Sequence, residues 1–186
     1  YNDQEVVIVA DKKDASKDVF EWIDTIVIAL ISVVIIFTFL FRIATIQGPS
    51  MQNTLYSGER VVITNLFYEP EYGDIIVISR NTDNSVGEKP EGNEPIIKRV
   101  IATEGQYVDI DFEEGKVYVG RDLGNMKELN EPYTKTPTNL MYDVEFPVYV
   151  EQGYVFVLGD NRNDSIDSRS SSIGKGGLVD KRYILG

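Results

Sequence analysis

Two residue types are absent from this sequence of 186 residues, cysteine and histidine. Without cysteine the chain can form no disulfide, no thiolate nucleophile and no cysteine-bound zinc or iron–sulfur centre. Without histidine it can hold neither a Ser-His-Asp triad nor the HExxH site of a metalloprotease. Any hydrolase built from this chain must therefore use serine or threonine with lysine, a pair of carboxylates, or a carboxylate-bound metal.

Positive charge is also scarce, with 18 Lys and Arg against 30 Asp and Glu and a formal net charge of −12. Nucleic-acid binding requires a positive field along the phosphates, so we expect no nucleic-acid partner. An acidic surface of this kind keeps a domain soluble. The sequence begins at Tyr1 rather than Met, and we expect native residues to be missing at either end.

One long apolar run occupies residues 23–41, IDTIVIALISVVIIFTFLF. As a helix it would be ~28 Å long, close to the ~30 Å hydrocarbon core of a bilayer. It has no polar face, unlike a helix on the surface of a soluble core. It is also longer than the apolar core of a cleaved signal peptide, roughly 7–15 residues. We predict a transmembrane anchor over residues 22–42; a buried helix of a larger assembly is the alternative.

Lysines on one side of this run predict its orientation. Lys12, Lys13 and Lys17 precede it, whereas only Arg42 follows it closely. By the positive-inside rule, residues 1–21 form a cytoplasmic tail. Residues 43–186 then form an extracytoplasmic domain behind a single-pass anchor in the cell membrane.

After the anchor the pattern becomes that of β-structure. Short runs rich in β-branched and aromatic residues alternate with Gly, Pro, Asn and Asp clusters, which is typical of an all-β domain with tight turns. These runs are residues 61–64, 74–79, 96–101, 107–110, 116–119 and 154–158. We expect an exposed loop over residues 81–94 and a small β subdomain at about residues 111–147.

Four segments occur in an order that resembles a known family. They are GPSMQNTL at 48–55, YGDIIV at 72–77, IKRVIATEG at 97–105 and GDNRNDSIDSR at 159–169. With the single N-terminal span, they resemble bacterial type I signal peptidase in its single-anchor, Gram-positive-like form. The resemblance implies a mainly β fold, a signal-peptidase-like β-barrel catalytic domain behind one N-terminal transmembrane helix.

The residues themselves indicate how serine chemistry could work without histidine. A serine hydroxyl is a poor nucleophile unless a neighbouring base takes its proton, and a neutral lysine amine can replace imidazole. Lys98 follows Ile96 and Ile97, and burial in such a strand lowers the pKa of a lysine from its usual ~10.4. Strand alternation points Lys98 and Arg99 to opposite faces. A surface lysine and an ordinary turn serine are the plain alternatives; the resemblance marks Ser50 as nucleophile and Lys98 as general base.

The resemblance also assigns supporting roles within the motifs. It places a serine hydroxyl, here Ser165, near the lysine, where it helps to orient the amine. The residues that match those holding the site together are Asp160, Asp167, Arg169 and Arg99, and Asp160 could pair with Arg99. A calcium loop is an alternative for 160–167, although the glycine and glutamate of an EF-hand are missing.

The oxyanion of the tetrahedral intermediate needs preorganised donors. The resemblance gives the backbone N–H of Ser50 as the first donor. Some members carry a hydroxyl two residues before the nucleophile, but that position here is Gly48, so the second donor stays open.

The resemblance implies a substrate class, preproteins whose signal peptides carry small residues at the first and third positions before the cut. Ile46, Leu55 and Ile97 lie at motif-aligned positions that could line shallow pockets for them; ordinary core packing is the alternative. We expect no metal and no cofactor. The expected partners are signal peptides, the lipid bilayer and the protein-export machinery.

Three other functions fit parts of the sequence. A self-cleaving, repressor-like Ser/Lys peptidase would be cytosolic and DNA-associated, which the apolar span and the net charge oppose. A catalytically inactive, membrane-tethered β module is opposed by the joint presence of Ser50, Lys98 and Ser165. A carboxylate-pair hydrolase would need a paired arrangement of acids that does not stand out.

Overall fold

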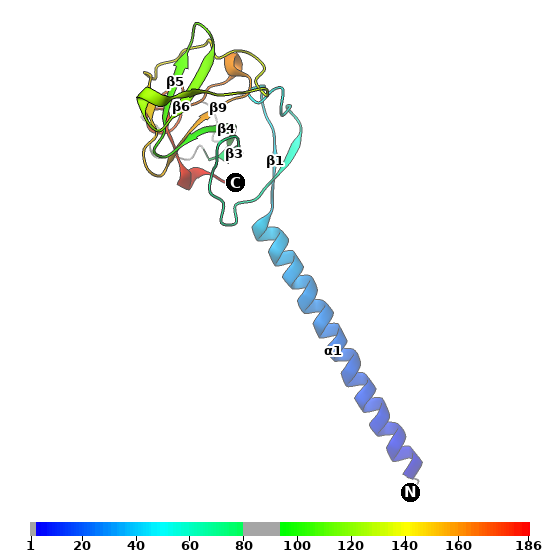
Figure 1. Cartoon of the computed structure of the whole chain (residues 1–186). Helices are drawn as coiled ribbons and strands as arrows, with labels where there is room; N and C mark the ends of the chain where they lie inside the picture. Colours follow the sequence, from blue (N-terminus) through cyan, green and yellow to red (C-terminus); the bar gives the residue numbers. More distant parts are fainter. Residues whose placement is uncertain (1–2, 80–93) are drawn as a thin grey trace. The chain divides into compact units, whose positions relative to one another are not determined.

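The computed structural model describes residues 3–79 and 94–186, which divide into two compact units, Tyr1–Arg42 and Ile43–Gly186. Figure 1 shows the helix of the first unit and the strands of the second. The loop predicted over residues 81–94 lies outside the described residues, apart from Glu94.

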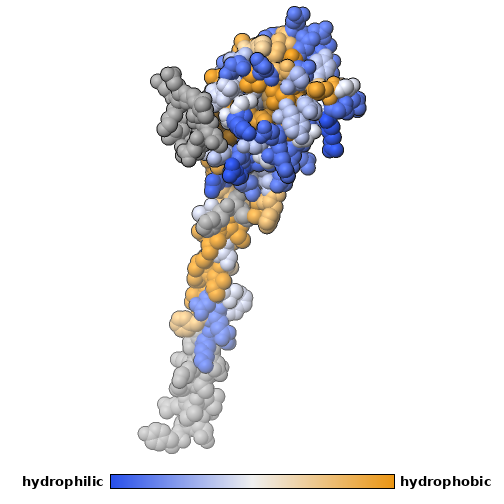
Figure 2. All heavy atoms as spheres, turned by 90° about the vertical axis from the view of Figure 1, so that its left-hand side faces the viewer, coloured by the Kyte–Doolittle hydropathy of each residue, from blue (hydrophilic) through white to orange (hydrophobic). Residues whose placement is uncertain are grey.

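The first unit is one continuous helix, α1 (Asp3–Leu40), which runs through both the polar N-terminal residues and the apolar run. Its segment Lys17–Thr38 is long and apolar enough to cross a membrane by length and composition, and none of that stretch is buried. Figure 2 shows apolar residues along this part of the helix.

The hydroxyl groups within the apolar run are satisfied inside the helix. Thr25, Ser32 and Thr38 each donate to the carbonyl four residues earlier, at 2.8, 2.7 and 2.7 Å. In hydrocarbon a polar group without such a partner is costly, because no water is present to pair with it. These hydroxyls are therefore compatible with an apolar surrounding.

The second unit is mainly β, as the sequence predicts. One four-stranded sheet has the order β10-β9-β4-β3, a second has the order β7-β6-β5-β8, and β1 pairs with β2. The strands are β1 (Arg42–Thr45), β2 (Arg60–Ile63), β3 (Ile75–Ile78), β4 (Ile96–Thr103), β5 (Tyr107–Asp111), β6 (Lys116–Gly120), β7 (Lys127–Glu128), β8 (Val148–Tyr149), β9 (Tyr154–Leu158) and β10 (Val179–Asp180). Short 3₁₀ turns are η1 (Leu123–Asn125), η2 (Arg162–Asp164) and η3 (Lys181–Tyr183).

Two hydrophobic clusters flank the sheet that contains β4 and β9, because side chains alternate between its faces. In β9, Phe156 packs into a cluster with residues of β5 and β6, and Val157 packs into a cluster with Ile76 of β3. Figure 1 shows β4 and β9 between β5 and β6 on one side and β3 on the other. Strands β4 and β9 are thus buried on both faces, which fixes the strand that carries Lys98 and the strand that leads into the motif at 159–169.

The six strand segments expected from the sequence all form strands, with ends that differ by at most two residues. Four further strands, β1, β7, β8 and β10, were not predicted; each has only two to four residues. The second sheet runs from β5 to β8 and so covers the region in which the sequence suggests a small subdomain.

Candidate active site

Ser50 lies in the turn between β1 and β2, and this turn is held by the chain that follows β9. The backbone N–H of Asn161 donates to the Ser50 carbonyl at 2.9 Å, and its side-chain amide donates to the Pro49 carbonyl at 3.1 Å. The next residue, Met51, is buried at 1% exposure. The backbone around the serine is therefore fixed from both sides, while the serine itself is only half-buried.

Lys98 lies within β4, opposite Ile76 of β3, and its side chain is directed at this serine. Its Nζ and the Ser50 Oγ are 2.9 Å apart, within hydrogen-bond distance. Lys98 is 4% exposed. Residues 48 positions apart in the sequence are thus brought into contact by the packing of the turn against the sheet.

Arg99, the next residue in β4, makes a separate set of contacts. Its Nε and Nη2 donate to the two carboxylate oxygens of Asp160 at 2.8 and 2.6 Å, and its Nη1 donates to the Gly73 carbonyl at 2.7 Å. Thr54, from the segment that follows Ser50, also donates to Asp160. Asp160 is fully buried, so this two-point pairing with an arginine compensates the loss of its hydration.

Ser165 follows η2 and lies close to Gly159. Its hydroxyl is buried and has no hydrogen-bond partner among the residues that the structure describes. A Cβ added to Gly159 would collide with the Ser165 hydroxyl and come within 2.7 Å of the Ser50 carbonyl oxygen. Glycine at position 159 therefore allows the two serines to lie side by side.

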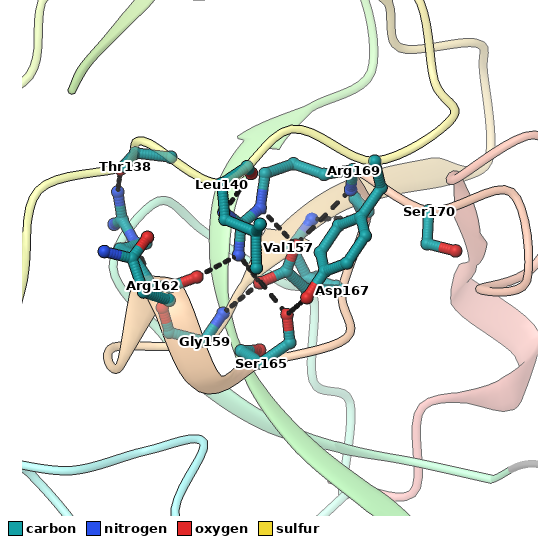
Figure 3. A network of polar contacts seen from close by, with 12 residues as sticks. Thr138, Leu140, Val157, Gly159, Arg162, Ser165, Asp167, Arg169 and Ser170 are labelled. Carbon is teal, nitrogen blue, oxygen red and sulfur yellow. Dashed lines mark hydrogen bonds and ion pairs between the residues drawn. The ribbon is translucent and has the colours of Figure 1, made fainter. Parts of the chain in front are cut away.

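Asp167 and Arg169 form a buried ion pair beneath the loop (Figure 3). The guanidinium of Arg169 donates to both carboxylate oxygens at 2.8 and 2.9 Å and also to the Leu140 carbonyl at 2.8 Å. Asp167 in turn accepts the Gly159 N–H at 3.0 Å. This pair fixes the backbone on either side of Ser165.

Two further groups belong to this network, although the sequence analysis did not single them out. Arg162 is 1% exposed, and its guanidinium is held by both carboxylate oxygens of Glu131 and by the Thr138 hydroxyl. The ring of Tyr133 lies against Arg99, with 4.0 Å between the ring centroid and Cζ. Burial and the neighbouring Glu131 carboxylate raise the pKa of Tyr133, so its phenol stays protonated. Arg162 lies inside a recognised motif, but nothing in the sequence around Glu131 and Tyr133 marks them.

The predicted pocket residues lie on three different segments. Ile46 follows β1 and is buried, Leu55 precedes β2 and is half-buried, and Ile97 lies half-buried in β4. Gly48 is exposed, has a φ of 79°, and has open space around the position of a Cβ.

A calcium loop at 160–167 is disfavoured by the charges that occupy it. The carboxylates of Asp160 and Asp167 are already paired with Arg99 and Arg169. A cation would have to displace buried guanidinium groups to reach them. Across residues 3–79 and 94–186, no group of three or more acidic side chains is arranged to hold a metal ion.

Known proteins resemble this chain over most of its length. The model of the family described as "Signal peptidase, peptidase S26" matches residues 19–186. "Signal peptidase I" of Bacillus licheniformis is 32% identical over 96% of this chain and 91% of its own length. "Signal peptidase I P" of Bacillus subtilis subsp. natto is 32% identical over 95% of this chain and 90% of its own length.

A solved signal peptidase I structure from Enterococcus faecalis V583 is 26% identical, covering 64% of this chain and 96% of the other. Its TM-score is 0.43, a similarity too loose to define the fold by itself. The family model and the two relatives of similar length carry the assignment. This chain therefore belongs to the signal peptidase family, peptidase S26, and is a serine endopeptidase of the signal peptidase I kind.

Proposed function

We propose that this chain is a membrane-anchored peptidase that cuts signal peptides from exported preproteins by means of a Ser50–Lys98 dyad. One observation carries the dyad: the Lys98 amine and the Ser50 hydroxyl are 2.9 Å apart, on a lysine that is 4% exposed. A buried amine favours its neutral form, which can accept a proton. With no histidine in the chain, no imidazole competes for that role.

The reaction follows from this contact. Lys98 accepts the hydroxyl proton as the Ser50 Oγ attacks the scissile carbonyl, and a tetrahedral oxyanion forms. The Ser50 N–H is one donor to that oxyanion. Collapse of the intermediate breaks the peptide C–N bond, and the protonated amine of Lys98 gives its proton to the departing amine. Water, deprotonated by the same lysine, then hydrolyses the acyl-enzyme and regenerates the serine.

Supporting residues hold this geometry in the proposal. Asn161 fixes the backbone of the serine, while Asp160 and Arg99 join the loop after β9 to β4. The role we propose for Ser165 is to orient the Lys98 amine, and the Arg169 guanidinium, which is paired with Asp167, donates to the Ser165 carbonyl at 3.3 Å.

The anchor adds a concentration effect. Because α1 carries a segment that can cross a bilayer, enzyme and signal peptide would be confined to the same membrane, which raises their effective concentration. In the orientation we propose, Lys12, Lys13 and Lys17 lie on the cytoplasmic side and the β domain lies outside the cytoplasm. There it can meet preproteins as they leave the export machinery.

Cleavage after small residues at the first and third positions before the cut is the specificity we propose. Ile46, Leu55 and Ile97 come from segments next to Ser50 or Lys98 and are the candidates for lining the shallow pockets. An Ala-x-Ala preprotein and matched versions with a bulky residue at either position would measure this preference.

The test of the dyad uses the full chain in liposomes with an Ala-x-Ala preprotein. We expect Ser50→Ala and Lys98→Met each to lower kcat by ~10⁴-fold or more, since neither half of the pair works alone. Ser57→Ala and Lys127→Met, at exposed positions, are the matched controls and should keep wild-type rates. A chelator should leave cleavage unchanged.

Wild-type cleavage by both dyad variants would exclude Ser50 and Lys98 as a working pair. Loss of cleavage in the chelator alone would instead point to a carboxylate-bound metal. Cleavage abolished in both dyad variants and retained in both controls is the expected outcome.

A further inference from the structure

The segment from Glu131 to Thr138 lies outside all four sequence motifs, yet it contacts the loop that holds the nucleophile at several points. The backbone N–H of Lys135 donates to the Asp160 carbonyl at 3.0 Å, and the Lys135 Nζ donates to Gln52 at 2.8 Å. The Thr136 hydroxyl accepts the Asn163 N–H at 3.3 Å. Residues 131–138, here called the strap, carry one carboxylate, that of Glu131.

Glu131 is bound by three donors at its two carboxylate oxygens. The Arg162 guanidinium donates to Oε1 at 2.6 Å and to Oε2 at 2.9 Å, and the Tyr133 hydroxyl donates to Oε1 at 2.8 Å. The Glu131 side chain is 10% exposed and that of Arg162 is 1% exposed. A bidentate pair at this depth fixes the plane of the guanidinium as well as its charge.

The third guanidinium nitrogen of Arg162 links the orientation of this side chain to the backbone of the site. The Arg162 Nε donates to the Gly159 carbonyl at 3.0 Å. Gly159 lies against Ser165 and the Ser50 carbonyl, and Asn161, two residues later, donates to the carbonyls of Ser50 and Pro49. A rotation of the guanidinium would therefore move the peptide groups that hold the serine.

Tyr133 gives Glu131 a second route to the same loop. The Tyr133 ring covers the guanidinium of Arg99, whose fork holds Asp160. Burial and the charge of Glu131 raise the pKa of Tyr133, which keeps the phenol as a donor to that carboxylate. Glu131 thus orients two arginines of this network. It holds Arg162 directly, and it holds Arg99 through the ring of Tyr133.

We propose that Glu131 is a positioning residue for the peptidase reaction, which acts through Arg162 and Tyr133 on residues 159–161 and so keeps Ser50 within reach of Lys98. This inference rests on the dyad proposed above. It predicts that loss of the Glu131 charge lowers the rate of the chemical step and leaves preprotein binding unchanged, because the Glu131 carboxylate is bonded to Arg162 and Tyr133.

Two variants separate positioning from simple stability. In Glu131→Gln one carboxylate oxygen becomes an NH₂ group, which faces an N–H or O–H donor instead of accepting from it. Tyr133→Phe is milder: it removes the bonds of the phenol to Glu131 and Tyr72 and keeps the ring over Arg99. The matched controls are Glu145→Gln and Tyr149→Phe, at exposed positions away from this network.

The full chain in liposomes is assayed with the Ala-x-Ala preprotein, and urea unfolding gives the folded fraction of each variant. We expect Glu131→Gln to lower kcat per folded molecule by ~10–100-fold, with KM changed by less than ~twofold. Tyr133→Phe should lower kcat by a smaller factor, with its urea midpoint near that of the wild type. Both controls should match the wild type in every measurement.

Three outcomes would overturn the inference. Full kcat in both strap variants, with Ser50→Ala inactive, removes the role of Glu131 and leaves the dyad in place. A rate loss that disappears when rates are counted per folded molecule makes Glu131 structural only. Full activity in Ser50→Ala and Lys98→Met removes the dyad, and the positioning role fails with it.

Discussion

Lys98 and Arg99 are adjacent in β4 and almost equally buried, at 4% and 8% exposure, yet Lys98 contacts the Ser50 hydroxyl whereas Arg99 contacts Asp160 and the Gly73 carbonyl. Alternation along the strand sends one to Ser50 and the other to Asp160 and Gly73. A single strand thus carries the lysine that we propose as general base and, on its other face, an arginine that holds the surrounding loop.

Ser165 and Ser168 provide a contrast at the same scale, since both are buried but only one hydroxyl has a structural partner. The Ser168 Oγ accepts the Val157 N–H at 2.9 Å, whereas the Ser165 hydroxyl has no hydrogen bond within the described part of the chain. Removing an unpaired hydroxyl leaves no orphaned partner, whereas removing a paired one does.

We therefore expect Ser165→Ala to leave the free energy of unfolding within ~1 kcal/mol of the wild type, or to raise it. If Ser165 orients Lys98, the same change lowers kcat by ~10-fold or more. Ser168→Ala, the matched change, should cost ~1–3 kcal/mol of stability. Urea unfolding and preprotein cleavage on the same samples measure both quantities. A large stability loss in Ser165→Ala would show that its hydroxyl has a structural partner after all.

Among the secondary-structure elements, the strands that the sequence predicts are the longer segments rich in β-branched and aromatic residues. Strands β3, β4 and β9 are runs of β-branched and aromatic residues, and such runs are visible without any tertiary information. Strands β7, β8 and β10 have two residues each, and a pair of residues carries no periodicity. The N-terminal half of α1 is polar and highly charged, so the sequence predicts a helix only for the apolar half.

The candidate site divides in the same way. Ser50, Lys98, Asp160 and Arg169 lie in segments whose residue order resembles a family, so they were found by resemblance. Glu131 and Tyr133 lie in a stretch with weak patterning, and Glu131 meets Arg162 across 31 positions. Contacts of that kind depend on how the loops after β7 and β9 fold over one another, which no local pattern records.

The turn η3 offers a test of acid sensitivity in one element. Asp180 caps it by accepting the Arg182 N–H at 2.9 Å, and its carboxylate is bonded by the Arg182 guanidinium. The Arg182 side chain is the main cause that lowers the pKa of Asp180. The pKa of Asp180 is therefore lower in the folded state than its unfolded value of ~3.9. The stabilisation of the folded state by this carboxylate is present above pH ~3.9 and is lost as the pH falls through the folded pKa.

We expect Asp180→Ala to lower the free energy of unfolding by about 1 kcal/mol at pH 7. Below the folded pKa of Asp180 the variant and the wild type should converge. Asp122→Ala is the control. Asp122 also precedes a 3₁₀ turn, η1, but its side chain makes no capping hydrogen bond among the described residues. Urea unfolding at a series of pH values would measure this, and a difference that persists unchanged in acid would contradict it.

For the molecule as a whole, the main question is whether α1 holds the β domain on a bilayer. Its side chains from Lys17 to Thr38 are exposed, and Ile31 lies in the apolar run at 53% exposure. In water such a surface would be unfavourable, since each Ile, Leu, Val or Phe gains ~1.5–3 kcal/mol from leaving water. A bilayer supplies the apolar surrounding that the described chain does not.

Ile31→Arg should weaken membrane insertion, because an arginine near the centre of a span costs ~2.5–3.5 kcal/mol. We expect a smaller share of this variant in the membrane pellet after an alkaline wash, and slower cleavage of a membrane-bound preprotein. Leu123→Arg adds the same charge at an exposed position of the β domain and should behave as the wild type. Equal retention of the two variants would mean that the helix does not span the membrane.

Gly159 has a consequence for how this chain can change over generations. Every single-nucleotide replacement of a glycine codon that changes the amino acid adds a Cβ, and here that atom would meet Ser165 and the Ser50 carbonyl. No single substitution of Gly159 is therefore neutral while Ser165 and the Ser50 backbone keep their present positions. A lineage could vary position 159 only if both Ser165 and the Ser50 backbone had moved, so position 159 cannot diverge independently of the two serines.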